Sequence, residues 1–298
     1  MKILSLLKRL CLMSSKISSL SKQNLTPKLQ VKDYLVSGEN FHLFHDNQWD
    51  MLVTVPQPEN LSKYYDSPEY KPHEHSSKGF FDKLYNFIRN RSYQYKLKIF
   101  KRFHPSAQSV LDYGTATGEF LHFLKQKTFK VSGVEPNKKA RERANHLLDG
   151  EVKVSLDEIT NKVDIISLWH VLEHIPDPDG LIEKLKEKLQ PNGMIVIAVP
   201  NFKSYDAQYY RQYWAAYDVP RHLWHFSPLS LQKLFAQHGM KLVGQKPLYF
   251  DSFYVSLLSE QYKTGKKRFL PAFFTGLKSN WKARKTGQYS SLIYMFKQ

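Results

Sequence analysis

The chain has 298 residues, of which 42% are hydrophobic and 14% aromatic, enough apolar material for a large globular core. Its single cysteine, Cys11, excludes an intramolecular disulfide framework and a cysteine zinc cluster, which suits a reducing cytoplasm. No stretch reaches the roughly 18 apolar residues that a membrane-spanning helix needs.

The net charge of +17 is concentrated at the two ends of the chain. Residues 1–32 carry seven Lys/Arg and no acid, and residues 260–298 carry nine Lys/Arg and the acid Glu260, which leaves only +2 for residues 33–259. A nearly neutral body argues against a nucleic-acid groove, so no specific nucleic-acid partner is expected. The basic, partly apolar ends either contact anionic lipid or another acidic surface peripherally, or are solvated tails.

The first part of the chain is expected to precede the main domain. Residues 1–32 are predicted to be a basic leader, either disordered or a short amphipathic helix, because Lys8 and Arg9 interrupt the apolar run of a signal peptide. Residues 33–75 are turn-rich and aromatic, which predicts an irregular or β-containing segment. Apolar residues at helical spacing from residue 80 predict a capping helix that ends near His104, so residues 33–104 form an N-terminal preface.

Residues 105–298 show short apolar runs that alternate with helical patterns. Strands are predicted near 109–113, 130–135, 152–154, 163–169 and 194–199, and helices near 118–127, 137–148 and 178–189. Continuous apolar strands separated by helices indicate parallel pairing with helices on both faces. The prediction is a doubly wound α/β sheet, which binds ligands beyond the carboxyl ends of its strands.

The pattern changes after the fifth strand. Residues 201–226 contain nine aromatic residues and are interpreted as an aromatic lid over a substrate cavity. The Ser227-Pro228 start signal predicts a helix over 227–238. A strand near 240–249, a basic aromatic insert at 255–288 and a final strand at 290–296 complete the predicted domain, which then has seven strands.

The stretch "LDYGTATGEFL", residues 111–121, looks like a nucleotide-binding turn. Asp112 ends a strand, Gly114 and Gly118 flank the turn, and a helix follows whose backbone N–H groups suit a phosphate or carboxylate. A dinucleotide fingerprint fails, because Ala116 and Glu119 stand where it requires its second and third glycines. A P-loop fails as well, because no Gly-Lys-Ser/Thr follows.

The spacing D-x-G-x-G-x-G, with Ala116 at the middle glycine, resembles the class I S-adenosylmethionine-dependent methyltransferases. "GVEPN" (133–137), "DIISLWHVLEHIPDP" (164–178) and "LQPNGMIVIAVPN" (189–201) resemble three further motifs of that family in the same order. "HVLEHI" together with "VPRHLWHFSP" is similar to the small-molecule branch that includes ubiquinone-biosynthesis O-methyltransferases. The resemblance implies a Rossmann-like fold with a mostly parallel seven-stranded sheet, and S-adenosylmethionine as cofactor.

The resemblance also implies a set of cofactor-binding residues. Glu135, at the end of the second strand, would accept hydrogen bonds from the ribose hydroxyls, and Asp112 would hold the turn or bind the cofactor's ammonium group. Glycines are expected in the turn because side chains there would occupy ligand space. If Ala116 has a positive φ, it costs on the order of 1 kcal/mol, which weakens binding without forbidding it. The full set is Asp112, Gly114, Thr115, Ala116, Gly118, Glu135, Pro136 and Trp169.

Two histidines are candidate catalytic bases. Methyl transfer to a nucleophile that carries a proton needs a base, and His170 follows the fourth strand with a near-neutral reference pKa. His222, beside Arg221 in the aromatic segment, is the second candidate. The alternatives are that His170 only packs against the cofactor edge, and that the segment around His222 and His225 braces the lid against the body.

His170, Glu173 and His174 are candidate ligands of a metal ion. Some relatives in this branch bind a divalent metal through a Glu-x-x-Glu-His set, and here His170 replaces the first Glu. The i, i+3, i+4 spacing of His170, Glu173 and His174 would place them on one helical face, where mixed ligands suit a transition metal. The favoured interpretation is no functional metal, with Glu173 and His174 held by structural hydrogen bonds.

The favoured function is methylation of a small, hydrophobic or aromatic acceptor, at an oxygen atom. Methylases of nucleic-acid bases have an Asn/Asp-Pro-Pro-aromatic motif after the fourth strand, where this chain has "LWHVLEH". An RNA or protein methyltransferase that docks through its basic ends is one alternative. A non-catalytic member that has lost cofactor affinity at Ala116 is another. A cytoplasmic protein, peripheral to the inner face of a membrane, suits the first hypothesis.

Overall fold

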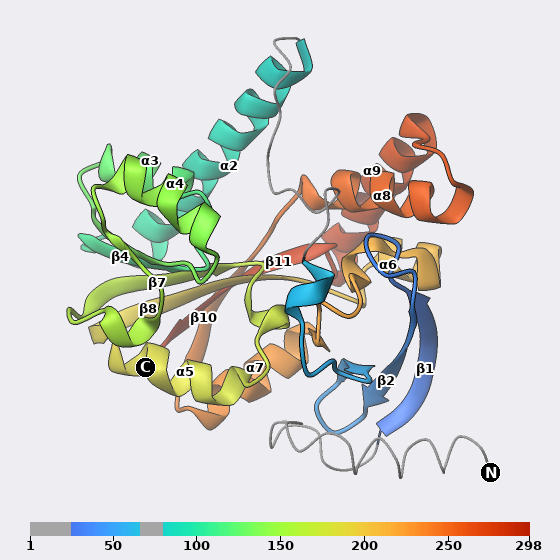
Figure 1. Ribbon diagram of the computed structural model, residues 1–298, viewed down its shortest axis with the longest axis horizontal. Helices are drawn as coiled ribbons and strands as arrows, with labels where there is room; N and C mark the ends of the chain where they lie inside the picture. Colours follow the sequence, from blue (N-terminus) through green and yellow to red (C-terminus); the bar gives the residue numbers. More distant parts are fainter. Residues whose placement is uncertain (1–24, 66–79) are drawn as a thin grey trace.

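A computed structural model describes residues 25–65 and 80–298, with side chains from residue 86 onward in the second range (Figure 1). Its larger sheet has seven strands in the order β10-β11-β8-β7-β4-β5-β6. The pairs among β4 to β8 are parallel, whereas β10 and β11 add antiparallel at one edge. The predicted mostly parallel seven-stranded sheet is therefore confirmed. Its strands are β4 (Ser109–Tyr113), β5 (Lys130–Val134), β6 (Val152–Lys153), β7 (Val163–Trp169), β8 (Leu189–Pro200), β10 (Lys241–Pro247) and β11 (Ser291–Lys297).

Helices cover both faces of this sheet, as the sequence predicted. One face carries α2 (Phe80–Phe103), α3 (Glu119–Lys125) and α4 (Lys138–Leu148), and the other carries α5 (Pro178–Glu187) and α7 (Pro228–Gln237) (Figure 1). Successive strand residues point to opposite faces of the sheet. Ile165 therefore packs in the core under α2, α3 and α4, and Ile166 in the core under α5 and α7. Burial on both faces explains why the strands read as continuous apolar runs.

A second, antiparallel sheet lies beside the first and has the order β1-β2-β3-β9. It consists of β1 (Leu25–Lys32), β2 (Asn40–Asp46), β3 (Met51–Val55) and β9 (Trp224–His225). The predicted leader is wrong over residues 25–32, which form β1, and its residues 1–24 lie outside the described residues. β1 was not predicted because it is an edge strand. Its Lys, Gln and Pro side chains face solvent and obscure the alternation of apolar and polar residues that is typical of a strand.

The aromatic segment after β8 contains α6 (Tyr205–Tyr210) and two short 3₁₀ helices, η5 (Arg211–Tyr213) and η6 (Ala215–Tyr217). Its large rings are mostly buried: Trp214, Tyr217 and Trp224 are each at most 3% exposed. The segment thus supplies core between the two sheets. Three further 3₁₀ turns are η2 (Ser62–Tyr64), η3 (Leu156–Glu158) and η4 (Leu172–His174).

The basic insert is a helical hairpin made of α8 (Asp251–Thr264) and α9 (Phe269–Thr286). It lies near α6, on the side of the molecule where β1 and β2 are found (Figure 1). Among the described helices, none combines the length and the apolar character that crossing a membrane requires.

Candidate active site

The loop between β4 and α3 follows a left-handed path, with φ of 79° at Gly114, 50° at Ala116 and 80° at Gly118. A Cβ at Gly114 would lie 2.5 Å from Cγ2 of Val171, and one at Gly118 would lie 2.9 Å from Cβ of Ala144. The protein itself thus requires glycine at both positions, and the occupation of ligand space by a side chain there stays a prediction. Ala116 adopts the positive φ at a cost on the order of 1 kcal/mol.

Glu135 follows β5 and is joined directly to this loop. Its Oε2 accepts a hydrogen bond from the backbone N–H of Ala116 at 2.9 Å, and its Oε1 accepts one from Asn137 at 2.9 Å. Arg141 donates to the backbone oxygens of Glu135 and Pro136 at 2.7 and 2.9 Å, which fixes the strand end. The carboxylate is 8% exposed and held in one orientation.

Asp112 lies under the loop and is 3% exposed. Burial raises the pKa of Asp112 to about 6, although a 2.5 Å hydrogen bond from Ser167 and the charge of Lys96 both favour its carboxylate form. The side chain is mostly ionised at pH 7. It therefore contributes a buried negative charge at the carboxyl end of β4.

Lys96 of α2 supplies a cation at the same edge. Its Nζ lies 3.8 Å from the ring centroid of Trp169 and 4.8 Å from that of Phe120. Burial lowers the pKa of Lys96 to about 8, while the charges of Asp112 and Asp251 oppose that shift. Lys96 was not predicted from the sequence as a site residue. Its i, i+4 spacing from the buried Phe100 is the signal that places it on the inward face of α2.

Trp169 ends β7 and carries a buried polar atom. Its Nε1 has no hydrogen-bond partner among the described residues. Buried donors are nearly always paired with protein, water or a ligand, so this N–H is available to a bound group. Lys96, Asp112, Glu135 and Trp169 together surround the carboxyl edge of β7, β4 and β5.

His170 is held between two carboxylates. Its Nε2 lies 3.1 Å from Oδ2 of Asp251 and its Nδ1 lies 3.5 Å from Oε1 of Glu173. Burial alone would lower the pKa of His170, but the hydrogen bond to Asp251 and the negative charges of Asp251 and Glu173 raise it to about 10. The imidazole is therefore a cation at neutral pH, the form that cannot accept a proton.

His222 has the opposite environment. Its Nδ1 donates a hydrogen bond to the backbone oxygen of Ala216 at 2.9 Å, which fixes the tautomer. Burial, assisted by the neighbouring His174, lowers the pKa of His222 well below its ordinary value. The ring is neutral, and its Nε2 lone pair lies 4.0 Å from Oε1 of Glu173 and 3.9 Å from Oδ2 of Asp218.

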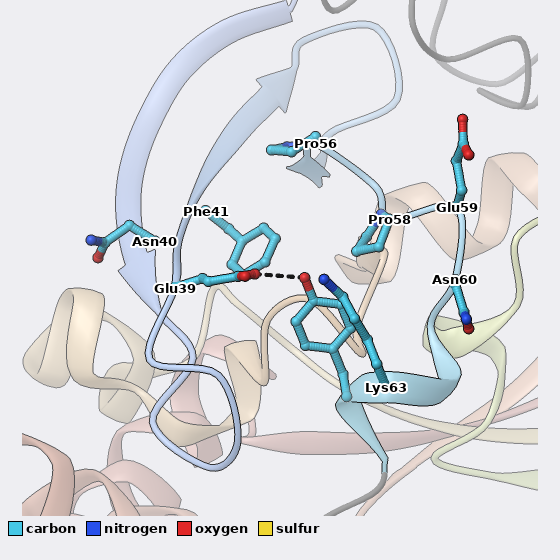
Figure 2. Close-up of a pocket in the computed structure, with 9 residues that line it drawn as sticks. Glu39, Asn40, Phe41, Pro56, Pro58, Glu59, Asn60 and Lys63 are labelled. Carbon is cyan, nitrogen blue, oxygen red and sulfur yellow. Dashed lines mark hydrogen bonds between the residues drawn. The ribbon is translucent and has the colours of Figure 1, made fainter.

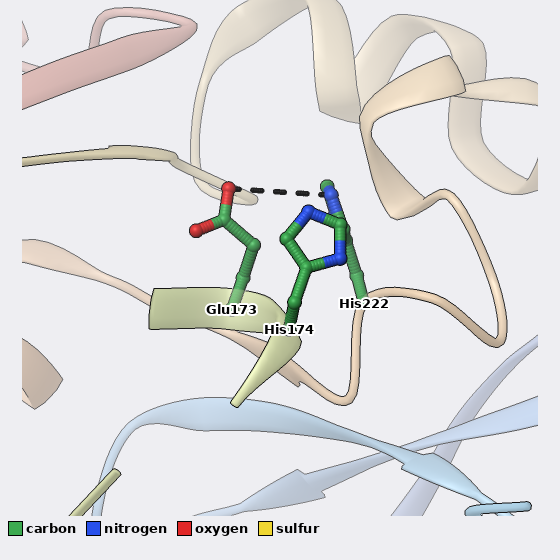
Figure 3. Close-up of side chains that lie close together, drawn as sticks. All are labelled: Glu173, His174 and His222. Carbon is green, nitrogen blue, oxygen red and sulfur yellow. Dashed lines mark ion pairs between the residues drawn. The ribbon is translucent and has the colours of Figure 1, made fainter. Parts of the chain in front are cut away.

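Glu173, His174 and His222 converge, with one ligand atom from each lying within 4.8 Å of the others (Figure 3). Nδ1 of His174 lies 3.0 Å from the backbone oxygen of Arg221 and 2.9 Å from Oη of Tyr65. Both imidazoles are thus oriented by contacts at Nδ1, as metal-binding histidines commonly are. These three residues have the donor set that could hold a divalent cation.

The predicted helical face of His170, Glu173 and His174 does not form. His170 precedes η4 with a φ of 56°, and His174 turns toward His222 instead of His170. Both Glu173 oxygens lack a hydrogen bond within the described part of the chain, so the predicted structural hydrogen bonds apply to His174 and not to Glu173.

The side chain of Arg221 and a groove near the N-terminal strands lie apart from this cluster. Arg221 is 1% exposed and pairs with Asp33 at 3.0 Å and Asp218 at 2.6 Å, which favours the bracing interpretation over anion binding. The groove of about 630 Å³ lies against β2 and η2, where Tyr64 donates a hydrogen bond to Glu39 at 2.6 Å (Figure 2). No predicted site residue lines it.

A comparison with protein families decides the identity. A family model described as a methyltransferase domain matches residues 86–245, more than half of the chain. The chain belongs to this methyltransferase family. The match confirms the resemblance seen in the sequence, the methyltransferase class and, at the level of the family, its S-adenosylmethionine cofactor.

Curated relatives of this methyltransferase match only in part. A ubiquinone biosynthesis O-methyltransferase of Cupriavidus pinatubonensis is 25% identical over 106 residues, 32% of this chain and 43% of the relative. A phosphoethanolamine N-methyltransferase 2 of Caenorhabditis elegans is 28% identical over 145 residues, 41% of this chain and 33% of the relative. The matches span between 33% and 64% of the length of the curated relatives.

Solved structures similar to the methyltransferase include StiE O-MT residues 961–1257, with a TM-score of 0.49, 15% identity, and coverage of 74% of this chain and 78% of that one. The plantazolicin methyltransferase BpumL, solved with a desmethyl analogue and SAH, has a TM-score of 0.48, 17% identity, and coverage of 71% and 85%.

Proposed function

We propose that this methyltransferase binds S-adenosylmethionine at the carboxyl edge of β4, β5 and β7 and methylates an oxygen of a small, lipophilic or aromatic acceptor. One observation carries the proposal: Glu135 accepts the backbone N–H of Ala116, so the acid and the glycine-rich loop form a single preorganised cradle. When bound, the cofactor supplies an electrophilic methyl group on a sulfonium centre.

The residues of the cradle fit the polar groups of such a cofactor. Each Glu135 oxygen uses one lone pair on a backbone N–H and keeps another for a hydroxyl of a vicinal diol. The anion of Asp112 suits an ammonium group, and the cation of Lys96 suits a carboxylate. The unpaired Nε1 of Trp169 is available to a further acceptor atom. These charges match a zwitterionic amino acid joined to a ribose.

His222 is the base that the geometry favours. Its ring is neutral, its Nδ1–H is already used by Ala216, and its Nε2 lone pair is free to accept the proton that an acceptor hydroxyl loses. Glu173, 4.0 Å away, stabilises the imidazolium that results. A base of this kind is needed for a hydroxyl nucleophile, which supports oxygen as the methylated atom.

For His170 the structure favours positioning over proton transfer. Its imidazolium bridges Glu173 of η4 and Asp251 of α8, and so joins the end of β7 to the hairpin. Removing this cation would leave the buried Glu173 without a charged partner, whereas Asp251 would keep Lys96. His170 therefore holds Glu173 in place beside His222.

Calorimetry tests the cofactor part of the proposal. S-adenosylmethionine and S-adenosylhomocysteine are both expected to bind with micromolar affinity, and binding of both weaker than millimolar would contradict the enzyme hypothesis. Methyl-labelled cofactor is then incubated with a fractionated metabolite extract. Label in an apolar small-molecule fraction supports the proposal, whereas label only in RNA or protein supports a macromolecular substrate.

A further inference from the structure

Helix α9 of the α8–α9 hairpin carries its large apolar side chains on the outside. The faces that the two helices bury are made mostly of small or hydroxylated residues. These are Ser252, Val255, Ser256, Ser259 and Glu260 on α8, and Ala272, Thr275, Gly276, Ser279 and Ala283 on α9. Ser279 of this inner face donates a hydrogen bond to Asp206 of α6 at 2.6 Å. The hairpin is thus fixed to the body through its small side chains.

The outer face of α9 is strongly apolar. Leu270 is 71% exposed and Trp281 is 60% exposed, although residues of this size are normally buried. At about 100° per residue, the exposed apolar residues fall within an arc of about 140° on one side of the helix. They are Phe269, Leu270, Phe273, Phe274, Leu277 and Trp281. Contiguous exposed patches of this kind mark interaction surfaces.

The charge around this face has one sign. Across Asp251–Thr286, all of which the structure describes, the two acids Asp251 and Glu260 are not exposed. The cations are all exposed: Lys263, Lys266, Lys267, Arg268, Lys278, Lys282, Arg284 and Lys285. On the helical wheel of α9, Lys278 and Lys285 lie immediately beside one border of the apolar arc. A groove of about 720 Å³ on this face is lined by Leu277, Trp281 and Arg284.

We infer that the outer face of α9 docks this protein on an anionic phospholipid bilayer, with the helix lying in the interface. Aromatic and aliphatic side chains enter the acyl boundary while lysines and arginines contact phosphate groups, which is the pattern of an interfacial helix. A second copy of the chain is disfavoured as the occupant, because a two-fold contact would bring two sets of cations together.

The other helix of the hairpin, α8, contacts the candidate active site. Asp251, the first residue of α8, lies 3.1 Å from His170. The hairpin that carries this face therefore contacts a residue of the candidate active site. Membrane docking itself rests on the hairpin alone and is measured without any cofactor or acceptor.

Vesicle sedimentation of the full chain tests the inference. The protein is expected to bind vesicles of phosphatidylcholine and phosphatidylglycerol (3:1) and to stay in the supernatant with phosphatidylcholine alone. Each cation near an anionic bilayer strengthens binding roughly fivefold, so K278Q/R284Q/K285Q is expected to weaken it at least about tenfold. F274S/L277S/W281S is expected to weaken it by a similar factor.

Matched variants replace exposed residues of the same kinds elsewhere. K127Q/K130Q/K162Q and L147S/L229S/V243S are expected to bind as the wild type does, and circular dichroism serves to check that each variant is folded. Brominated lipid is expected to quench Trp281. W281F is expected to keep vesicle affinity and lose that quenching.

Three results would overturn the inference. The first is a wild-type protein that stays in solution with anionic vesicles. The second is equal loss of binding in the hairpin variants and in their matched controls. The third is a concentration-dependent dimer, formed without vesicle binding and lost in F274S/L277S/W281S, which would make a second copy the occupant.

Discussion

Glu135 allows the sharpest test of the cofactor cradle. In Glu135→Gln the side-chain amide can accept a hydrogen bond through only one atom, so the N–H of Ala116 or of Asn137 loses its partner. The negative acceptor for the ribose diol is lost as well. A hydrogen bond to a charged group contributes about 1.5–3 kcal/mol, so the Kd for S-adenosylhomocysteine is expected to rise about 10- to 100-fold.

Two measurements separate the two consequences of this substitution. The lost loop contact affects the free protein and lowers its Tm, whereas the lost diol contact appears only in the Kd from calorimetry. Glu142→Gln is the control. Glu142 is an exposed acid of α4 that lies outside the cradle and forms only a surface ion pair with Lys138, at 4.0 Å. A folded Glu135→Gln protein whose Kd stays within about twofold of the wild type would refute the assignment of Glu135 as the diol acceptor.

Three further predictions concern the histidines and a metal. His222→Asn is expected to slow single-turnover methylation by about 10²- to 10⁴-fold with unchanged cofactor affinity, and an unchanged rate would refute the base. The pKa of His170, raised from 6.5 to about 10, gives stability that is present below pH 6.5 and lost as pH rises through 10. His170→Asn should therefore lower the free energy of unfolding more at pH 6 than at pH 9.5, by roughly 1 kcal/mol after discounting for a side chain that is 38% exposed; equal differences at both pH values would contradict this. Dialysis against a chelator is expected to leave the methylation rate unchanged, because the His170 cation already balances Glu173, and a loss reversed by Zn²⁺ would contradict it.

The central sheet was predictable because its local and global signals agree. Buried parallel strands require long apolar runs, and the helices between them require helical periodicity, so both are visible in the sequence. The motif around Gly114 added the prediction that a cofactor binds at the carboxyl edge of this sheet. A positive φ at Ala116 was considered from the sequence, and the structure has one.

The parts that sequence analysis missed depend on contacts between distant residues. β1 pairs with β2 through backbone groups, which its polar side chains do not reveal. The cationic state of His170 depends on Asp251, which lies 81 positions away in α8. The hairpin could be recognised only as a basic aromatic insert, because its inward face is small and polar and its outward face apolar, the reverse of the usual pattern.

The structure of a complex with S-adenosylhomocysteine tests the central claim most directly. The ribose hydroxyls are expected within about 2.6–3.2 Å of the Glu135 carboxylate, with the amino-acid end of the ligand between Asp112 and Lys96. A ligand bound elsewhere, or a different coenzyme at this edge of the sheet, would contradict the proposal.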